Sequence, residues 1–175
     1  MSQPFVQLLD NGPLAWGLAA CGLAQLSKLL IELVVHRRWR PAVLIETGGM
    51  PSSHSALVTG TAACIGLEQG FDQPLFALAA AVAFVVMYDA SGVRRAAGRT
   101  AERVNALPEA QGMPPLKTTL GHSRLEVLVG SLLGPLIGLV GDAFVGSPVH
   151  LAQQLGWLSG AVSYTHLTLP TIYSV

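Results

Sequence analysis

The sequence predicts an all-α, polytopic membrane protein: a helical bundle with about four transmembrane helices and one amphipathic loop helix. Three observations favour this fold class. Apolar residues make up 51% of the 175-residue chain and charged residues only 11%, against about 25% charged in an average soluble domain. The mean hydropathy is +0.51. The apolar residues gather in long runs, and polar loops separate these runs.

This composition also excludes several classes of protein. A chain this apolar can bury enough surface to fold, so it is not a disordered protein. Ten Lys and Arg balance ten Asp and Glu, so the basic excess of a nucleic-acid binder is missing. Cys21 and Cys64 both lie inside apolar runs, where we interpret them as small buried residues and not as a disulfide framework.

The first predicted span covers residues 14–35. At 1.5 Å per residue it is about 33 Å long, enough for the hydrocarbon core. It lacks the basic start of a signal peptide, so we expect a retained helix. Residues 55–68 and 74–88 are two shorter apolar runs that predict a tight helical hairpin. The turn residues between them are Gly70, Asp72 and Pro74, which are typical breakers.

The fourth predicted span is 125–145, which has glycines three or four residues apart. Such small residues allow helices to approach closely in a membrane. The pattern for a fifth helix over 149–162 is weak. We expect residues 1–162 to form one domain. Residues 163–175 (SYTHLTLPTIYSV) resemble translated sequencing-adapter sequence, so we leave them out of the predicted fold.

Two polar loops, 36–53 and 89–124, contain nine of the ten basic residues. If the hairpin crosses the membrane twice, both loops lie on the same side, and the positive-inside rule places that side in the cytoplasm. Residues 90–106 predict a helix with a weak apolar stripe and a basic stripe. It either rests on anionic headgroups or contributes arginines to an anion site. The apolar stripe comprises Ala90, Val93, Ala97, Ala101 and Val104.

Two histidine motifs lie in these loops. In GGMPSSHSA, residues 48–56, a turn opens a helix near His54, and the start of a helix favours anions. In GHSRLEVLVGSLLG, residues 121–134, His122 and Glu126 are four residues apart and share one face of a helix. A carboxylate beside an imidazole fixes its tautomer and strengthens it as a nucleophile.

These motifs resemble those of the type 2 phosphatidic acid phosphatases and vanadium-dependent haloperoxidases, in the divergent bacterial and plastid branch of that superfamily. Arg40-Pro41 resembles the end of the first family motif. Pro51-Ser52-Ser53-His54 resembles the second, with Ser53 in place of Gly. His122-x3-Glu126 resembles the third, with Glu in place of Asp, and YDASGVRR (88–95) belongs to the same pattern.

The resemblance implies a role for each matching residue. His122 would be the nucleophile and form a phosphohistidine, Glu126 would orient it, and His54 would be the general acid for the leaving group. The phosphate oxygens would be held by Arg40, Ser52 and Ser53. We expect a bacterial inner-membrane protein whose motif-bearing loops face the cytoplasm.

The chain departs from the family pattern at two places. Leu33 stands where the family has its Lys, and Pro115-Leu116 stands where the family has Ser-Arg. Asp89 either joins the site or pairs with a neighbouring arginine. Lys28 either substitutes for a missing cation or forms an internal pair with Glu32, as charges inside membranes usually do. The candidate substitute cations are Lys28, Lys117, Arg94 and Arg95.

The sequence therefore predicts a membrane phosphatase that hydrolyses a lipid or isoprenoid phosphate monoester or diphosphate. The alternative is a catalytically inactive protein that binds phospholipid or acts as a scaffold. A small transporter is less favoured because the chain lacks inverted repeats. We expect a lipid or polyprenyl phosphate and the bilayer as partners, and no nucleic acid, metal or cofactor. The sequence leaves the oligomeric state open.

Overall fold

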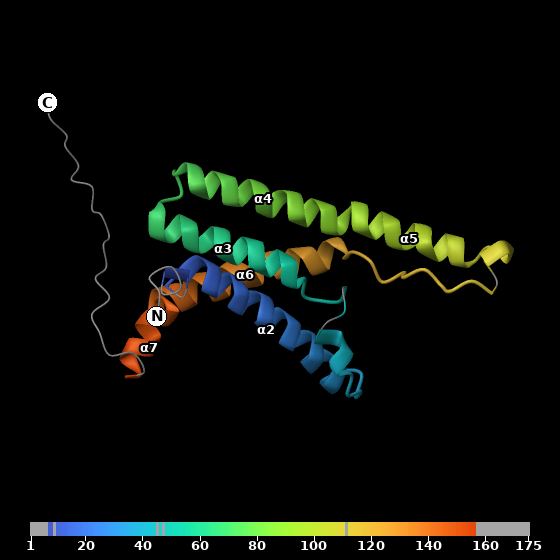
Figure 1. Ribbon diagram of the computed structural model, residues 1–175, viewed down its shortest axis with the longest axis horizontal. Coiled ribbons are helices and arrows are strands. Elements are labelled where there is room, and N and C mark those ends of the chain that lie inside the picture. The colour runs from blue at the N-terminus through green and yellow to red at the C-terminus, as the bar shows by residue number, and fades with distance from the viewer. Residues whose placement is uncertain (1–6, 9, 45, 47, 111, 157–175) are drawn as a thin grey trace, which may run out of the picture.

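The computed structural model describes residues 7–8, 10–44, 46, 48–110 and 112–156, which form an all-α bundle (Figure 1). The predicted fold class is therefore confirmed at the level of secondary structure. The predicted tail and the end of the predicted fifth helix lie outside the described residues. The helices are α2 (Gly12–Val34), α3 (Ser53–Gln69), α4 (Pro74–Ser91), α5 (Val93–Asn105), α6 (Arg124–Val145) and α7 (Pro148–Gln154), with two short 3-10 helices, η1 (Pro41–Leu44) and η2 (Pro108–Ala110).

Three stretches of the described chain are long and apolar enough to cross a membrane. They are α2, the stretch Pro74–Asn105 that joins α4 and α5, and α6. The fourth predicted span, α3, has 17 residues and is not among them. Its sequence is rich in Gly, Ala, Ser and Thr, because it packs against protein on several sides.

Helix α3 lies at the centre of the bundle, where it packs against α2, α4 and α6. The predicted glycines of α6 make this packing close. A Cβ added to Gly134 would lie 2.3 Å from the backbone oxygen of Ala56, and one added to Gly130 would lie 2.3 Å from that of Ser52. Such distances leave no room for a side chain, so the predicted close approach through small residues is confirmed.

The predicted hairpin is formed by α3 and α4. Gly70 ends α3 with a positive φ of 108°, a conformation that glycine adopts at little cost. Pro74 begins α4, where its fixed φ suits the first helical turn. The two helices run side by side in opposite directions (Figure 1).

Helices α4 and α5 follow each other almost in line, so that α5 extends beyond the rest of the bundle (Figure 1). The predicted apolar stripe of α5 is wrong in part, because Val93, Ala97 and Val104 are exposed. Ala90 and Ala101 of the stripe are buried as predicted, and the packed face of α5 also contains Gly98. The reason is that an extended segment, residues 116–122, covers this other face.

Several contacts attach this segment to α5. The side chain of Asn105 donates to the backbone oxygen of Leu116 and accepts from its backbone N–H, both at 2.9 Å. A Cβ on Gly98 would lie 2.7 Å from the backbone oxygen of Thr118. The backbone N–H of His122 donates to the backbone oxygen of Ala90 at 2.9 Å. Helix α5 is thus the support along which the chain returns to the bundle at His122.

The two basic loops meet at one end of the bundle, as the sequence predicts. The end of α2, the start of α3, the end of α4 and the start of α6 all lie there (Figure 1). The backbone N–H of Ser52 donates to the backbone oxygen of Glu126 at 3.0 Å and joins the starts of α3 and α6. Both histidine motifs therefore occupy the same end.

Candidate functional site

The second histidine motif begins α6 with a capping box. The hydroxyl of Ser123 accepts from the backbone N–H of Glu126 at 3.2 Å, and the Glu126 carboxylate accepts from the backbone N–H of Ser123 at 2.8 Å. This reciprocal pair satisfies two backbone donors that a helix start leaves free. It also fixes the Glu126 carboxylate next to the residue that precedes Ser123, which is His122.

His122 is buried, with 6% of its surface exposed. Its Nδ1 lies 3.3 Å from Oε2 of Glu126. An ionised carboxylate only accepts hydrogen bonds, so the contact favours the tautomer with the proton on Nδ1. The Nε2 atom then carries the free lone pair. Burial and the positive charge of Lys28 lower the pKa of His122, against the opposite effect of Glu126, so the neutral ring is favoured.

The first histidine motif begins α3 with buried serines. Ser52 caps the helix: its hydroxyl accepts from the hydroxyl of Ser55 at 2.9 Å and from the backbone N–H of Ser55 at 3.4 Å. Ser52 and Ser53 are buried and His54 is exposed. The serine side chains thus form the helix start, and His54 is the side chain that this turn presents outward.

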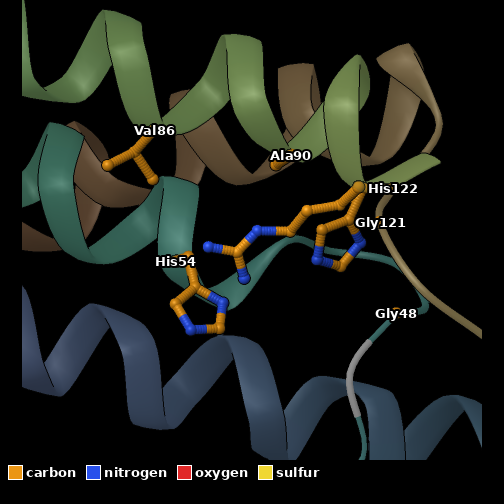
Figure 2. Close-up of a pocket in the computed structure, with 7 residues that line it drawn as sticks. Gly48, His54, Val86, Ala90, Gly121 and His122 are labelled. Carbon is orange, nitrogen blue, oxygen red and sulfur yellow. The ribbon is translucent and has the colours of Figure 1, made fainter. Parts of the chain in front are cut away.

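His54 and His122 line one small open pocket, and in Figure 2 their rings face a common space between α2 and α4. The rest of its wall mixes glycine backbone, apolar side chains and one cation. The full lining is Gly48, His54, Val86, Ala90, Arg94, Gly121 and His122. Two imidazoles that are 68 residues apart in the chain therefore share a single cavity, with a guanidinium beside them.

Arg94 is the pocket's cation, and Asp89 is its partner. The Nε of Arg94 donates to Oδ2 of Asp89 at 2.5 Å. Of the two alternatives for Asp89, the structure shows the pair with Arg94, and Asp89 is not part of the pocket wall. Arg95, the other candidate in this turn, is half-buried and lies outside the wall.

Lys28 is buried in α2, with 4% of its surface exposed. Its predicted alternative partner, Glu32, instead accepts from Nδ1 of His36 at 3.1 Å, so the internal Lys28–Glu32 pair is wrong. Among the described residues Lys28 has no ion-pair partner within 4.0 Å. Its charge acts on both pocket histidines. A buried ammonium without an ion pair among the described residues is costly, so this position suits an anion.

Two other predicted cations lie elsewhere. Arg40 is exposed and donates to both oxygens of Glu46, at 2.7 and 3.0 Å. Lys117 is exposed on the extended segment and does not line the pocket. The sequence placed neither Val86 nor Ala90 at the site, because apolar side chains carry no chemical signal. Gly48 and Gly121 stand inside the two quoted motifs, so their position was the available signal.

The chemistry of this pocket is that of an anion site with one oriented nucleophile. Within the described part of the chain, no group of three or more His, Cys, Asp or Glu is placed to hold a metal ion. The polar groups at hand are two imidazoles, a guanidinium and a nearby ammonium. All four are cations or can become cations, which suits a phosphate group.

Fold and pocket together define a multi-pass membrane protein with two histidines in a pocket at one end of its helical bundle. Comparison with known families agrees with this class. The chain belongs to the divergent PAP2 family, whose model matches residues 9–137. All residues of the pocket lie within that range, and the resemblance inferred from the motifs is confirmed.

A relative of known sequence gives the same result. The chain is 41% identical over 152 residues to a Bacillus subtilis (strain 168) protein described as "Uncharacterized membrane protein YuiD". The match covers 77% of this chain and 96% of that protein. No solved structure matches the chain.

Proposed function

We propose that this protein is a membrane phosphatase that hydrolyses a lipid or isoprenoid phosphate monoester or diphosphate. The observation that carries the proposal is the pocket itself. A buried His122, whose Nδ1 is held by Glu126, shares one cavity with His54 and Arg94. This is the arrangement of a nucleophile, an orienting carboxylate, an acid and a charge clamp.

The reaction would proceed in two displacements. Nε2 of His122 attacks the phosphorus atom, the bond from phosphorus to the leaving oxygen breaks, and His54 gives its proton to that oxygen. A phosphate dianion next to His54 favours the charged form that the acid needs. Water, deprotonated by His54, then attacks the phosphohistidine and releases inorganic phosphate. Both histidines return to their starting states.

The cations would stabilise the phosphoryl group during transfer. Arg94 reaches the pocket from the start of α5, and Lys28 brings a second charge from α2. We assign to them the tasks that the family pattern gives to the missing Lys and Ser-Arg. A guanidinium can bind two phosphate oxygens at once and an ammonium acts as a point charge, so the two are complementary. Contacts of Arg40, Ser52, Ser53, Arg95 and Lys117 with phosphate stay predictions.

The substrate would reach the pocket from the membrane. Val86 and Ala90 place an apolar wall next to the polar groups, on the side of α4 that continues into the bundle. A phosphate carried by a long alkyl or prenyl chain fits such a boundary between polar and apolar surface. We further propose that α3 is a fourth crossing, since it connects the two ends of the bundle and α2, α4 and α6 shield it. The motif end would then face the cytoplasm of a bacterial inner membrane.

Purified protein in detergent tests the proposal through release of phosphate from phosphatidate and from polyprenyl phosphates. We expect turnover by the wild type and a loss of at least about a thousandfold in His122→Ala, because the covalent route disappears. His36→Ala is the matched control, since His36 is exposed and pairs with Glu32 away from the pocket. An acid-labile, base-stable phosphoryl label on the wild type would identify the intermediate. Equal turnover in wild type and His122→Ala contradicts the proposal.

A second candidate is a protein that binds phosphorylated lipid without turnover. It is favoured by Leu33, Pro115 and Leu116, which stand where the family pattern has its cations and serine. This candidate requires saturable binding of phosphatidate vesicles with no release of phosphate. Steady release by the wild type rejects it.

A further inference from the structure

We infer that Asp89 is a positioning residue of the phosphate site, acting through Arg94. Asp89 holds the Nε edge of that guanidinium, so that the terminal nitrogens stay available to an anion in the pocket. The inference rests on the proposed function, because it assigns a task within the same site. The quoted pattern YDASGVRR (88–95) includes Asp89 but assigns it no task.

The geometry of the pair supports these separate roles for the Nε edge and the terminal nitrogens of Arg94. A guanidinium carries five N–H groups in a rigid plane. In Arg94 the Nε–H points to Asp89 at 2.5 Å, and no other hydrogen bond of this guanidinium is found within the described chain. Four N–H groups therefore remain, on the two terminal nitrogens that form the fork preferred by phosphate oxygens.

Exposure explains why a holder is needed. The side chain of Arg94 is 57% exposed and that of Asp89 is 34% exposed. A long, exposed side chain samples many rotamers, and fixing it upon binding costs conformational entropy. A carboxylate that already holds one edge of the guanidinium reduces this cost. The pair thus orders Arg94 before the anion arrives.

The location of the pair links it to the nucleophile. Asp89 lies in the last turn of α4 and Arg94 in the first turn of α5, on either side of Gly92. Between them, the backbone oxygen of Ala90 accepts the N–H of His122. The junction of α4 and α5 therefore positions both Arg94 and the proposed nucleophile, His122. Asp89 itself is absent from the pocket wall, and its carboxylate contacts Arg94.

Binding of orthophosphate and of orthovanadate to the full-length protein in detergent tests the inference by titration calorimetry. Asp89→Asn and Arg94→Gln should each weaken binding about tenfold, the usual effect of losing one charge-assisted contact. If Asp89 acts through Arg94, the double variant should bind no more weakly than Arg94→Gln alone. Asp89→Glu should restore most of the affinity. Glu102→Gln, an exposed carboxylate on α5, is the matched control and should leave binding unchanged.

Each outcome supports or overturns the inference. Full additivity in the double variant, or normal binding by Asp89→Asn beside weakened binding by Arg94→Gln, overturns it. The same holds if Asp89→Glu binds as weakly as Asp89→Asn while melting like the wild type. Since these probes need no turnover, a wild type that binds phosphate but releases none from lipids ends the proposed hydrolysis and leaves the positioning role. Turnover by the wild type, together with an unchanged KM in Asp89→Asn, supports the proposed hydrolysis and overturns the positioning role. A wild type that binds neither anion contradicts both proposals.

Discussion

Opposite charges act on the imidazole of His122. Glu126 stabilises its protonated form, and the ammonium of Lys28 together with burial opposes that form. The balance favours the neutral ring, so its pKa lies below the ordinary value of 6.5. A phosphohistidine mechanism needs the neutral ring as nucleophile. Lys28 thus has two tasks in the proposed reaction, to attract the anion and to keep the nucleophile unprotonated.

Replacing Lys28 with Met tests the second of these tasks, the effect of its charge on His122. The variant removes a positive charge that lowers the pKa of His122, so this pKa should rise. The neutral fraction of His122 grows as pH rises through its pKa, so the acidic limb of kcat/KM should move to higher pH. Titration of the His122 ring by NMR checks the shift without any need for turnover. Arg103→Met, at an exposed position of α5, should leave the titration in place, and a fall in the pKa of His122 in Lys28→Met would contradict the assignment.

For single residues, the sequence predicts the chemistry of a side chain better than it predicts which groups surround that side chain. His122 and Glu126 lie together as the sequence predicts, but not on one face of a helix: His122 precedes the N-cap Ser123, and the capping box turns the Glu126 carboxylate back toward it. The choice among basic residues was not accessible in the same way. Arg40 lies against Glu46 and Arg94 lies at the pocket, and both follow from where the loops fold back. No local pattern states which arginine will lie at the pocket.

Helix α5 shows the corresponding limit for elements. Periodicity predicted a helix over 90–106, and the structure has one over Val93–Asn105. It did not predict the packed face, because the segment that covers α5 is extended backbone without a periodic pattern. Gly98, which weakens a helix by intrinsic propensity, is the residue that lets this backbone approach. An apparent defect in the helix pattern was therefore the signal for the contact.

The contact between α3 and α6 should be sensitive to a single methyl group. Gly130→Ala places a Cβ 2.3 Å from the backbone oxygen of Ser52, so the helices must separate. Overpacking of this kind costs about 1–3 kcal/mol, and the melting temperature in detergent should fall. Gly22→Ala is the matched control, because a Cβ at Gly22 meets nothing within 4 Å. Equal melting temperatures for the two variants would show that α3 and α6 are not in close contact.

In the whole molecule, the two basic loops and the histidine pocket lie at the same end of the bundle. The hairpin prediction implied that both basic loops share one end, and the bundle has them there (Figure 1). In the described part of the chain, three helices meet the length and composition of a span. The central α3 connects the same two ends, and other helices shield it. The apolar run of α3 is short because a helix covered by protein does not need a long apolar surface.

Labelling of introduced cysteines tests the proposed orientation in bacterial cells. Trp39→Cys, after α2, and Met113→Cys, in the loop after α5, change exposed residues of the two basic loops. With a membrane-impermeant maleimide, both should react only after the cells are opened. Gln73→Cys, in the exposed turn between α3 and α4, should react in intact cells. Opposite behaviour of the Trp39 and Met113 variants would rule out a shared side, and reaction of both in intact cells would place the pocket outside the cytoplasm.

The bond between the Ser52 N–H and the Glu126 oxygen bears on biogenesis. One partner is synthesised more than seventy residues before the other, so a nascent chain that has already inserted α2, α3 and α4 still lacks the acceptor. The contact between the starts of α3 and α6 can therefore form only after α6 has begun to be synthesised. A fragment that ends before residue 122 contains only one imidazole of the pair.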